Sequence, residues 1–254
     1  MALDILGRFF LFFTSAFCIV PISLIGYWAF RKEIFGRLVF LILFSMVFSL
    51  YLKSIWQEPL PAWMNSDTWA FPSGHMLFTV TFYGWMAFEF RKRWLSICAG
   101  TIMLGVGWAL VHFRYHTLRD VMASVGFGGA TLIAYYFFLK VPLIKRNLPL
   151  VGLILSPLTI FFIYLIPKYF AYAYEAQGQL VGFSGGWFLW NRYCRQDLSK
   201  PEKIRALLVS FLGAAIFVGL GFVAPKEPIT VLILSCLMGF SISFPGFGLL
   251  YRKK

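Results

Sequence analysis

This sequence of 254 residues has few charged side chains, and acidic ones are scarcest. Charged residues make up 13% of it and hydrophobic residues 60%, and aspartate and glutamate together number 10. The mean hydropathy is +0.77, and no polar segment is long enough to form a separate soluble domain. This scarcity of charge excludes a soluble globular protein.

Cysteine and histidine are scarce as well. The four cysteines are Cys18, Cys98, Cys194 and Cys236. They have neither metal-type spacing nor the placement for an extracellular disulfide, so we interpret them as small apolar side chains. Two of the three histidines lie in short polar islands, residues 71–75 and 116–120, within very hydrophobic surroundings. Ionisable groups are costly to keep at the edge of a bilayer, so these islands indicate a functional site.

Long hydrophobic runs, in contrast, are abundant. About 20 apolar residues cross a bilayer as a helix, and nine runs approach or exceed this length. They are residues 9–30, 38–52, 68–88, 94–111, 121–139, 147–167, 171–191, 206–224 and 228–251. We therefore predict an all-α fold, a polytopic integral membrane bundle of about nine transmembrane helices.

The distribution of basic residues predicts the orientation of this bundle. The formal net charge of +13 would by itself be compatible with nucleic-acid binding. Under the nine-span prediction, however, 17 of the 23 basic residues lie on one side, in the connections 31–37, 91–93, 140–146, 192–205 and 252–254. Excess Lys and Arg mark the cytoplasmic side. We therefore predict an outer N-terminus, a cytoplasmic C-terminus and no nucleic-acid partner.

Both polar islands fall on the predicted outer side, where basic residues are rare. Lys53, Arg114 and Arg119 nevertheless lie in the two outer connections that hold the islands, residues 53–73 and 113–120, so we expect them to do more than orient the chain. His116 and Asp120 are four residues apart and would share one face of a helix. A carboxylate one turn from an imidazole can orient the ring and stabilise its cationic form.

The other island, Pro72-Ser73-Gly74-His75, precedes a hydrophobic run that we expect to be helical. The first backbone N–H groups of a helix have no partner within it and form a natural phosphate cradle. Gly74 permits close approach of the backbone, and Ser73 adds a hydroxyl donor. Lys53, at the end of the second span, supplies a cation at the same depth.

In this order, Lys53, Pro72–His75, and His116 with Asp120 resemble the motifs of the type 2 phosphatidic acid phosphatase (PAP2) superfamily. That family's signature is Lys-x6-Arg-Pro, Pro-Ser-Gly-His and Ser-Arg-x5-His-x3-Asp. The second motif is complete here. The first lacks its arginine, whose position holds Leu60, and the Ser-Arg pair of the third falls on Ala109 and Leu110.

The resemblance implies a metal-independent lipid phosphate phosphatase with no cofactor. His116 would attack the lipid phosphate and become a phosphohistidine, with Asp120 orienting it. His75 would protonate the leaving group and later activate water. Lys53, Ser73 and Gly74 would hold the phosphate oxygens. The implied substrates are membrane phospholipids or polyprenyl (di)phosphates.

The two missing arginines leave the phosphate with fewer cations than the family normally supplies. Arg119, three residues after His116, is the first candidate for a replacement cation, and Arg114 is the second. If neither serves, the site would suit a less charged phosphodiester. Related sphingolipid-type phosphotransferases use Ser-Gly-His and His-x3-Asp without these arginines, so lipid phosphotransfer is an alternative function.

Two further alternatives belong to other classes of protein. His112, His116 and Asp120 are spaced four residues apart and would lie on one helical stripe, which would suit a membrane metalloenzyme. Alternatively, a chain that kept the motifs and lost catalysis would be a lipid-binding or lipid-translocating membrane protein. Loss of activity on chelation would favour the first, and lipid binding without phosphate release the second.

All motif residues precede residue 121, which suggests that the chain has a catalytic part followed by a second part without motifs. We predict a PAP2-like catalytic core of five helices at residues 1–146 and a C-terminal transmembrane extension at 147–254, in a bacterial inner membrane with the active site on the periplasmic face. The weakest span of the extension, 171–191, is rich in glycine and contains Glu175, Gln177 and Gln179. We interpret it as a packed interior helix. Alternatively, Glu175 and the glutamines line a polar cavity. The oligomeric state is open.

Overall fold

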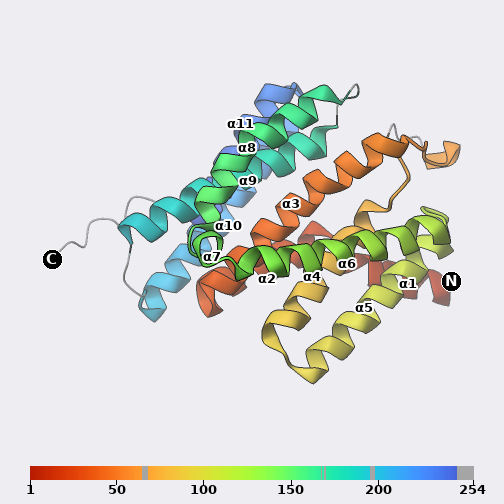
Figure 1. Cartoon of the computed structure of the whole chain (residues 1–254), viewed down its shortest axis with the longest axis horizontal. Coiled ribbons are helices and arrows are strands. Elements are labelled where there is room, and N and C mark those ends of the chain that lie inside the picture. Colours follow the sequence, from red (N-terminus) through yellow and green to blue (C-terminus); the bar gives the residue numbers. More distant parts are fainter. Residues whose placement is uncertain (65–67, 167, 169, 195–197, 245–254) are drawn as a thin grey trace. The chain divides into compact units, whose positions relative to one another are not determined.

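The computed structural model describes residues 1–64, 68–166, 168, 170–194 and 198–244, and in these ranges the chain is almost entirely helical (Figure 1). The α-helices are α1 (Ala2–Phe12), α2 (Ala16–Ile25), α3 (Lys32–Trp56), α4 (Gly74–Phe90), α5 (Arg93–His112), α6 (Leu118–Lys140), α7 (Pro142–Arg146), α8 (Leu148–Leu165), α9 (Ala171–Tyr193), α10 (Lys200–Val223) and α11 (Pro228–Ser243). A π-helix, η1 (Gly26–Phe30), follows α2, and a short 3₁₀-helix, η2 (Ala62–Met64), lies between α3 and α4. The prediction of an all-α fold is confirmed.

Six of the nine predicted spans have helices long and apolar enough to cross a membrane. Among the described residues these are Ala2–Phe30, Lys32–Trp56, Arg93–His112, Leu118–Lys140, Leu148–Leu165 and Lys200–Val223. They give the chain the character of an integral membrane protein.

The remaining three predicted spans do not reach that standard, so nine transmembrane helices are not confirmed. Helix α4 has 17 residues and α11 has 16, which is short for a full crossing. Helix α9 has 23 residues, but polar side chains lower its hydropathy. The end of the predicted span 228–251 and the last basic cluster, 252–254, lie outside the described residues.

The helices form two compact units, each built from two stretches of chain. The first comprises Met1–Ile22 and Phe48–Lys140, and the second comprises Ser23–Val47 and Val141–Lys254. Helix α3 contributes to both. The predicted domain boundary at residue 146 stays a prediction. The boundary between the two compact units lies at residue 140, and the segment 23–47 belongs to the second unit although it precedes most of the first in sequence.

In the first unit, α4 packs against both α5 and α6, and α1 packs against α5. A core of Met76, Val80, Val106, Leu110 and Val121 holds α4, α5 and α6 together. Glycines allow close approach here: a side chain at position 105 would overlap the ring of Phe10. This packing fixes the relative positions of the N-termini of α4 and α6.

In the second unit, α9 is the central helix and packs against α8 and α11 (Figure 1). A Cβ atom at Gly178 would lie 2.4 Å from the backbone oxygen of Leu232, and one at Gly182 only 1.8 Å from that of Cys236. Helices that approach this closely need glycine at the contact. Glu175 is exposed and Gln177 is buried. The structure thus shows α9 as a packed interior helix.

Candidate active site

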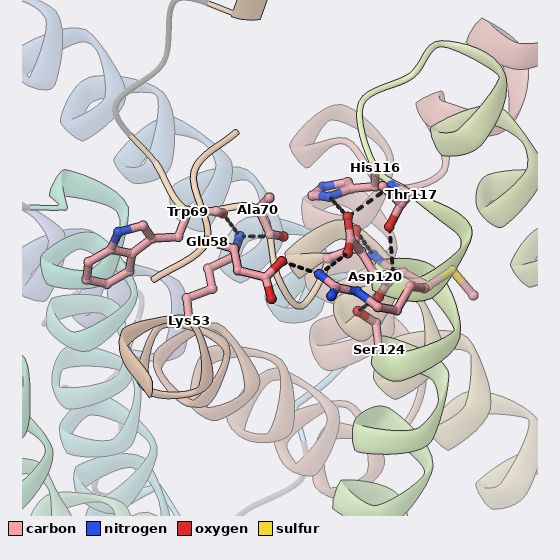
Figure 2. Close-up of polar contacts among 11 residues, drawn as sticks. Lys53, Glu58, Trp69, Ala70, His116, Thr117, Asp120 and Ser124 are labelled. Atoms are coloured by element: carbon pink, nitrogen blue, oxygen red, sulfur yellow. Dashed lines mark hydrogen bonds and ion pairs between the residues drawn. The ribbon is translucent and has the colours of Figure 1, made fainter. Parts of the chain in front are cut away.

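Three helix ends of the first unit meet at the candidate site: the C-terminal end of α3 and the N-terminal ends of α4 and α6 (Figure 2). Lys53 on α3 reaches the backbone of residues 69 and 70, just before α4. The backbone N–H of Ser73 donates to the carbonyl oxygen of Asp120 on α6, at 3.4 Å. The two polar islands, more than 40 residues apart in sequence, are therefore adjacent in space.

Helix α4 begins directly after Ser73, so Gly74 and His75 lie in its first turn and do not precede it as predicted. The Ser73 side chain is fully buried and accepts a hydrogen bond from the backbone N–H of Met76 at 3.4 Å, which makes it the N-cap. The hydroxyl proton of Ser73 is still available as a donor. A Cβ atom at Gly74 would lie 3.3 Å from the Ser49 hydroxyl and 3.8 Å from Cε of Lys53. Glycine thus lets the start of α4 pack tightly on α3.

Asp120 and Thr117 begin helix α6 by capping each other. The Asp120 carboxylate accepts from the Thr117 backbone N–H at 2.9 Å, and the Thr117 hydroxyl accepts from the Asp120 N–H at 3.3 Å. This is the reciprocal arrangement of a capping box, with aspartate at the third position. The Ser124 hydroxyl donates to the Asp120 carbonyl oxygen at 2.7 Å. The carboxylate is therefore held in a fixed orientation.

His116 precedes α6, so the expectation that it shares a helical face with Asp120 is wrong in its geometry. The capping by Thr117 makes α6 begin at Leu118, so His116 lies in the connection between α5 and α6. The two side chains still meet: Nδ1 of His116 lies 3.6 Å from Oδ2 of Asp120, and both are almost fully buried. This distance is an ionic contact that a small shift would convert to a hydrogen bond.

Burial lowers the pKa of His116 from 6.5 to about 4, and the charge of Lys53 acts in the same direction. Asp120 opposes this shift, and a charge on His75 adds to it. His116 is therefore a neutral imidazole near pH 7. With Nδ1 facing the carboxylate, Nε2 is the nitrogen that can act on a ligand.

His75 lies in the first turn of α4, one residue after Gly74. Its backbone carbonyl accepts the Thr79 hydroxyl at 2.7 Å, and its side chain is close enough for its charge to affect the pKa of His116. His75 and His116 are thus close enough within the first unit to interact electrostatically.

Lys53 is buried in the last turn of α3 and makes two backbone contacts. Its ammonium donates to the carbonyl oxygens of Trp69 and, at 3.3 Å, Ala70 (Figure 2). These contacts fasten the segment that precedes α4. An ammonium has three donors, so one proton remains for an anion. Lys53 therefore has a structural task in addition to the one predicted for it.

The two candidate replacement cations lie on the connection between α5 and α6 and on α6 itself. Arg119 forms an ion pair with Glu58, lies 3.6 Å from Oδ1 of Asp120 and covers the ring of Phe71. Arg114 follows α5 and has a φ of 55°, a left-handed conformation that turns the chain back towards the site. Both arginines line the same pocket as His116.

That pocket has a volume of about 510 Å³. Part of its wall is the segment between α3 and α4, including Glu58, Leu60, Trp63 and Ala70. The rest includes the connection between α5 and α6, with His116 and Thr117, and the start of α6, with Arg119 and Asp120. Leu60, at the position of the first missing arginine, thus lies at the pocket but contributes an apolar surface. Arg114 and Arg119 carry the positive charge of these walls.

Leu110, at the position of the second missing arginine, is buried in the core of α4, α5 and α6. It has an exposed fraction of 1%. A cation there would have no aqueous contact, so the side chain serves packing alone.

His112 is directed away from His116. Its Nε2 lies 3.0 Å from Asp4 on α1, and its ring stacks on Trp108 at 4.9 Å between centroids. Within the described ranges, no group of three or more His, Cys, Asp or Glu side chains has the arrangement to hold a metal ion. The predicted stripe of His112, His116 and Asp120 therefore does not form one ligand set there.

Helices long enough for a membrane and a buried His–Asp pair beside a capped helix N-terminus define the class: an integral membrane protein with a histidine–aspartate site. Residues 35–142 match the family model of the PAP2 superfamily. The chain therefore contains a PAP2 superfamily domain, which spans α3 to α6 and every predicted site residue. No curated protein and no solved structure matches the chain.

Sequence reasoning missed two residues of this site. Glu58 pairs with Arg119 across 61 positions of sequence, and no local pattern indicates that contact. Thr117 caps α6, and the spacing Thr-x-x-Asp, typical of a helix start, could have revealed it.

Proposed function

We propose that the chain is a metal-independent lipid phosphatase that acts on a membrane phospholipid or polyprenyl (di)phosphate. The observation that carries this proposal is the buried pair of His116 and Asp120 at the wall of a pocket that also contains two arginines. The PAP2 superfamily domain makes a phosphatase-type activity the natural expectation.

In this proposal His116 is the nucleophile. Its neutral ring attacks phosphorus through Nε2, while Asp120 keeps Nδ1 protonated and stabilises the positive charge of the phosphohistidine. His75 gives a proton to the departing oxygen and then takes one from the water that releases phosphate. Each step exchanges one bond to phosphorus for another and needs no oxidant or reductant.

The phosphate oxygens have several donors within this site. The first backbone N–H groups of α4 and the remaining proton of Lys53 would be two of these donors. Arg114 and Arg119, which line the pocket, would be the others. Fixed donors that meet the charge developing on phosphorus are typically the largest contribution to such a reaction.

The predicted membrane orientation belongs to the same proposal. The excess of basic residues in alternate connections supports a cytoplasmic C-terminus and a site at the outer face of a bacterial inner membrane. Labelling of a single introduced cysteine at exposed Leu118, in spheroplasts with a membrane-impermeant reagent, tests it. We expect labelling from outside; labelling only after lysis would contradict the orientation.

The activity itself is tested by phosphate release from a panel of phosphatidic acid, phosphatidylglycerol phosphate, lipid A phosphate and polyprenyl diphosphate, with and without a chelator. We expect release that the chelator leaves unchanged and that His116→Ala abolishes. His112→Gln is the matched control, because it changes a neighbouring histidine that contacts Asp4 and keeps a hydrogen-bonding side chain. Equal release by wild type and His116→Ala would refute the proposal.

A further inference from the structure

The site of the first unit carries less positive charge than its basic residues alone suggest. The charged side chains that line its pocket are Glu58, Arg114, Arg119 and Asp120. The two carboxylates offset the two arginines, so further positive charge must come from Lys53 and from His75 when it holds a proton. A phosphomonoester carries up to two negative charges near pH 7, whereas a phosphodiester carries one. Pocket walls without net charge offer little attraction for the second negative charge of a monoester.

Glu58 is the residue that makes this difference, and its backbone is fixed at the pocket wall. Its carbonyl oxygen accepts the Ala70 N–H at 2.7 Å, and the adjacent Pro59 forms an antiparallel bridge with Trp69. Lys53 holds the same two residues, Trp69 and Ala70, from the other side. The carboxylate of Glu58 therefore faces the pocket from a braced segment.

The ion pair between Glu58 and Arg119 is open to displacement by a ligand. The Arg119 side chain is 62% exposed and that of Glu58 36%, and exposed ion pairs contribute little to stability. A phosphate that binds Arg119 would leave the carboxylate of Glu58 facing the rest of the lipid head group. That carboxylate repels a second negative charge and attracts a positive one.

An aromatic ring of the pocket adds to this preference for a positive charge. Trp63 lies in the pocket wall, is 57% exposed and stacks on Tyr115 with ring centroids 5.8 Å apart. The face of a tryptophan ring attracts ammonium groups. A carboxylate and an exposed tryptophan within one pocket are side chains that recognise an amine.

We infer that the pocket selects a phosphodiester lipid whose head group carries an ammonium, and that Glu58 sets this preference. The inference rests on the proposed function, because it takes His116 as the residue that receives the phosphoryl group. An ethanolamine phospholipid has this chemistry: its phosphate fits Arg119 and His116, and its ammonium fits Glu58 and Trp63.

The reaction with such a lipid balances with water alone. Nε2 of His116 bonds to phosphorus, the bond from phosphorus to the glycerol oxygen breaks, and that oxygen takes the proton held by His75. Water then bonds to phosphorus and gives a proton to His75, and the bond from phosphorus to Nε2 breaks with its electron pair returning to nitrogen. The products are diacylglycerol and phosphoethanolamine.

The test compares three lipids with identical acyl chains: phosphatidylethanolamine, phosphatidylglycerol and phosphatidic acid. All three would release diacylglycerol, so one measurement of kcat/KM serves for each. For the wild type we expect phosphatidylethanolamine to react about tenfold faster than the other two. Glu58→Gln removes the negative charge, so its rate with phosphatidylethanolamine falls to that with phosphatidylglycerol and its rate with phosphatidic acid rises.

Two further variants keep this test specific. Glu227→Gln makes the same chemical change at an exposed residue of the second unit and leaves the lipid preference unchanged. Trp63→Leu keeps the charge of the site and lowers the rate with phosphatidylethanolamine about threefold, without raising that with phosphatidic acid. Unfolding temperatures check that each variant is folded.

The outcomes separate this inference from the proposed function. Turnover that favours phosphatidic acid and is unchanged in Glu58→Gln would overturn the inference and leave the phosphatase activity standing. The absence of diacylglycerol from every lipid, together with no phosphate release from the panel above, would overturn the proposed function. In that case calorimetric binding of dihexanoyl phosphatidylethanolamine and dihexanoyl phosphatidylglycerol decides the inference, and equal affinities would overturn it.

Discussion

The two compact units bury different kinds of polar side chain. Among the described residues, Lys53 and Asp120 are buried in the first unit and interact electrostatically. In the second unit the buried polar residues are serines and Gln177, and the ammonium of Lys32 is buried over the rings of Tyr27, Trp28 and Trp190. Burying a charge is far more costly than burying a hydroxyl that bonds to its own helix. The first unit therefore buries charges of opposite sign beside a pocket, the pattern of a reactive site, whereas the second buries the Lys32 cation among aromatic rings and otherwise packs its helices closely.

The largest expected effect on activity comes from removing the charge of Asp120, which tests whether the buried charges of the first unit serve catalysis. We expect Asp120→Asn to lower kcat on the order of 10³-fold, because the amide no longer stabilises a positive ring on His116. Phosphate release from the best lipid of the panel measures it.

Thr117→Ala is the control for the capping role of Asp120. It removes the hydroxyl that caps α6 but keeps the carboxylate, so we expect a loss of about 1 kcal/mol in stability and nearly normal turnover. Equal losses of activity in the two variants would mean that Asp120 acts only by starting the helix.

In the second unit the largest expected effect is on folding. Gly182→Ala places a methyl group 1.8 Å from the backbone oxygen of Cys236, so α9 and α11 must separate. We expect a loss of about 3 kcal/mol or more, measured by thermal or denaturant unfolding in detergent.

Gly185→Ala on the same helix is the matched control. Its added methyl group would meet only a side-chain atom of Leu153, at 3.9 Å, so its stability should equal that of the wild type. If the two variants are equally stable, the close approach of α9 and α11 is wrong.

The two pocket arginines should have intermediate effects on activity. Arg119→Ala and Arg114→Ala each remove a donor that can stabilise charge on the phosphate, so we expect kcat/KM to fall about tenfold in each. Arg93→Ala, at the opposite, exposed end of α5, should leave kcat/KM unchanged. Normal turnover by Arg119→Ala would show that this residue does not replace a missing arginine.

The smallest predicted change is in the pH profile. His116 must be neutral to attack, and its pKa is lowered from 6.5 to about 4 by burial and then by Lys53. On a phosphodiester lipid, whose phosphate keeps one charge in this range, protonation of His116 should therefore lower kcat/KM only near pH 4.

Variants of the neighbouring charges should move the acid limb of the pH profile, the fall of kcat/KM near pH 4, in opposite directions. Lys53→Met removes a positive charge and shifts the limb to higher pH, while Asp120→Asn shifts it to lower pH. A wild-type limb at pH 6.5 that neither variant moves would contradict the burial of His116.

The sequence alone predicted much of the first unit. Pro72–His75 placed the start of α4 to within two residues: the helix begins at Gly74 because Ser73 caps it, and this cap was not recognised from the sequence. The meeting of Ser73 and Asp120 followed from placing both islands on one membrane side. The position of His116 relative to α6 was wrong, since the capping by Thr117 was not recognised.

Contacts that depend on tertiary structure could not be predicted. The pairing of Glu58 with Arg119 and of His112 with Asp4 joins residues far apart in sequence, and neither has a local signature. The backbone contacts of Lys53 likewise depend on how the segment before α4 folds back onto α3. Hydropathy also did not predict that α4 and α11 are shorter than the other apolar helices, since burial within a bundle and burial in lipid select the same residues.

The central claim is that His116 carries the phosphoryl group during turnover. Rapid quenching of the wild type with a lipid labelled at phosphorus, followed by mapping of the labelled peptide, tests it most directly. The account predicts an acid-labile, base-stable label on His116 that disappears as product forms. A label on another residue, or product release in a single turnover with no labelled protein at any time, would contradict it.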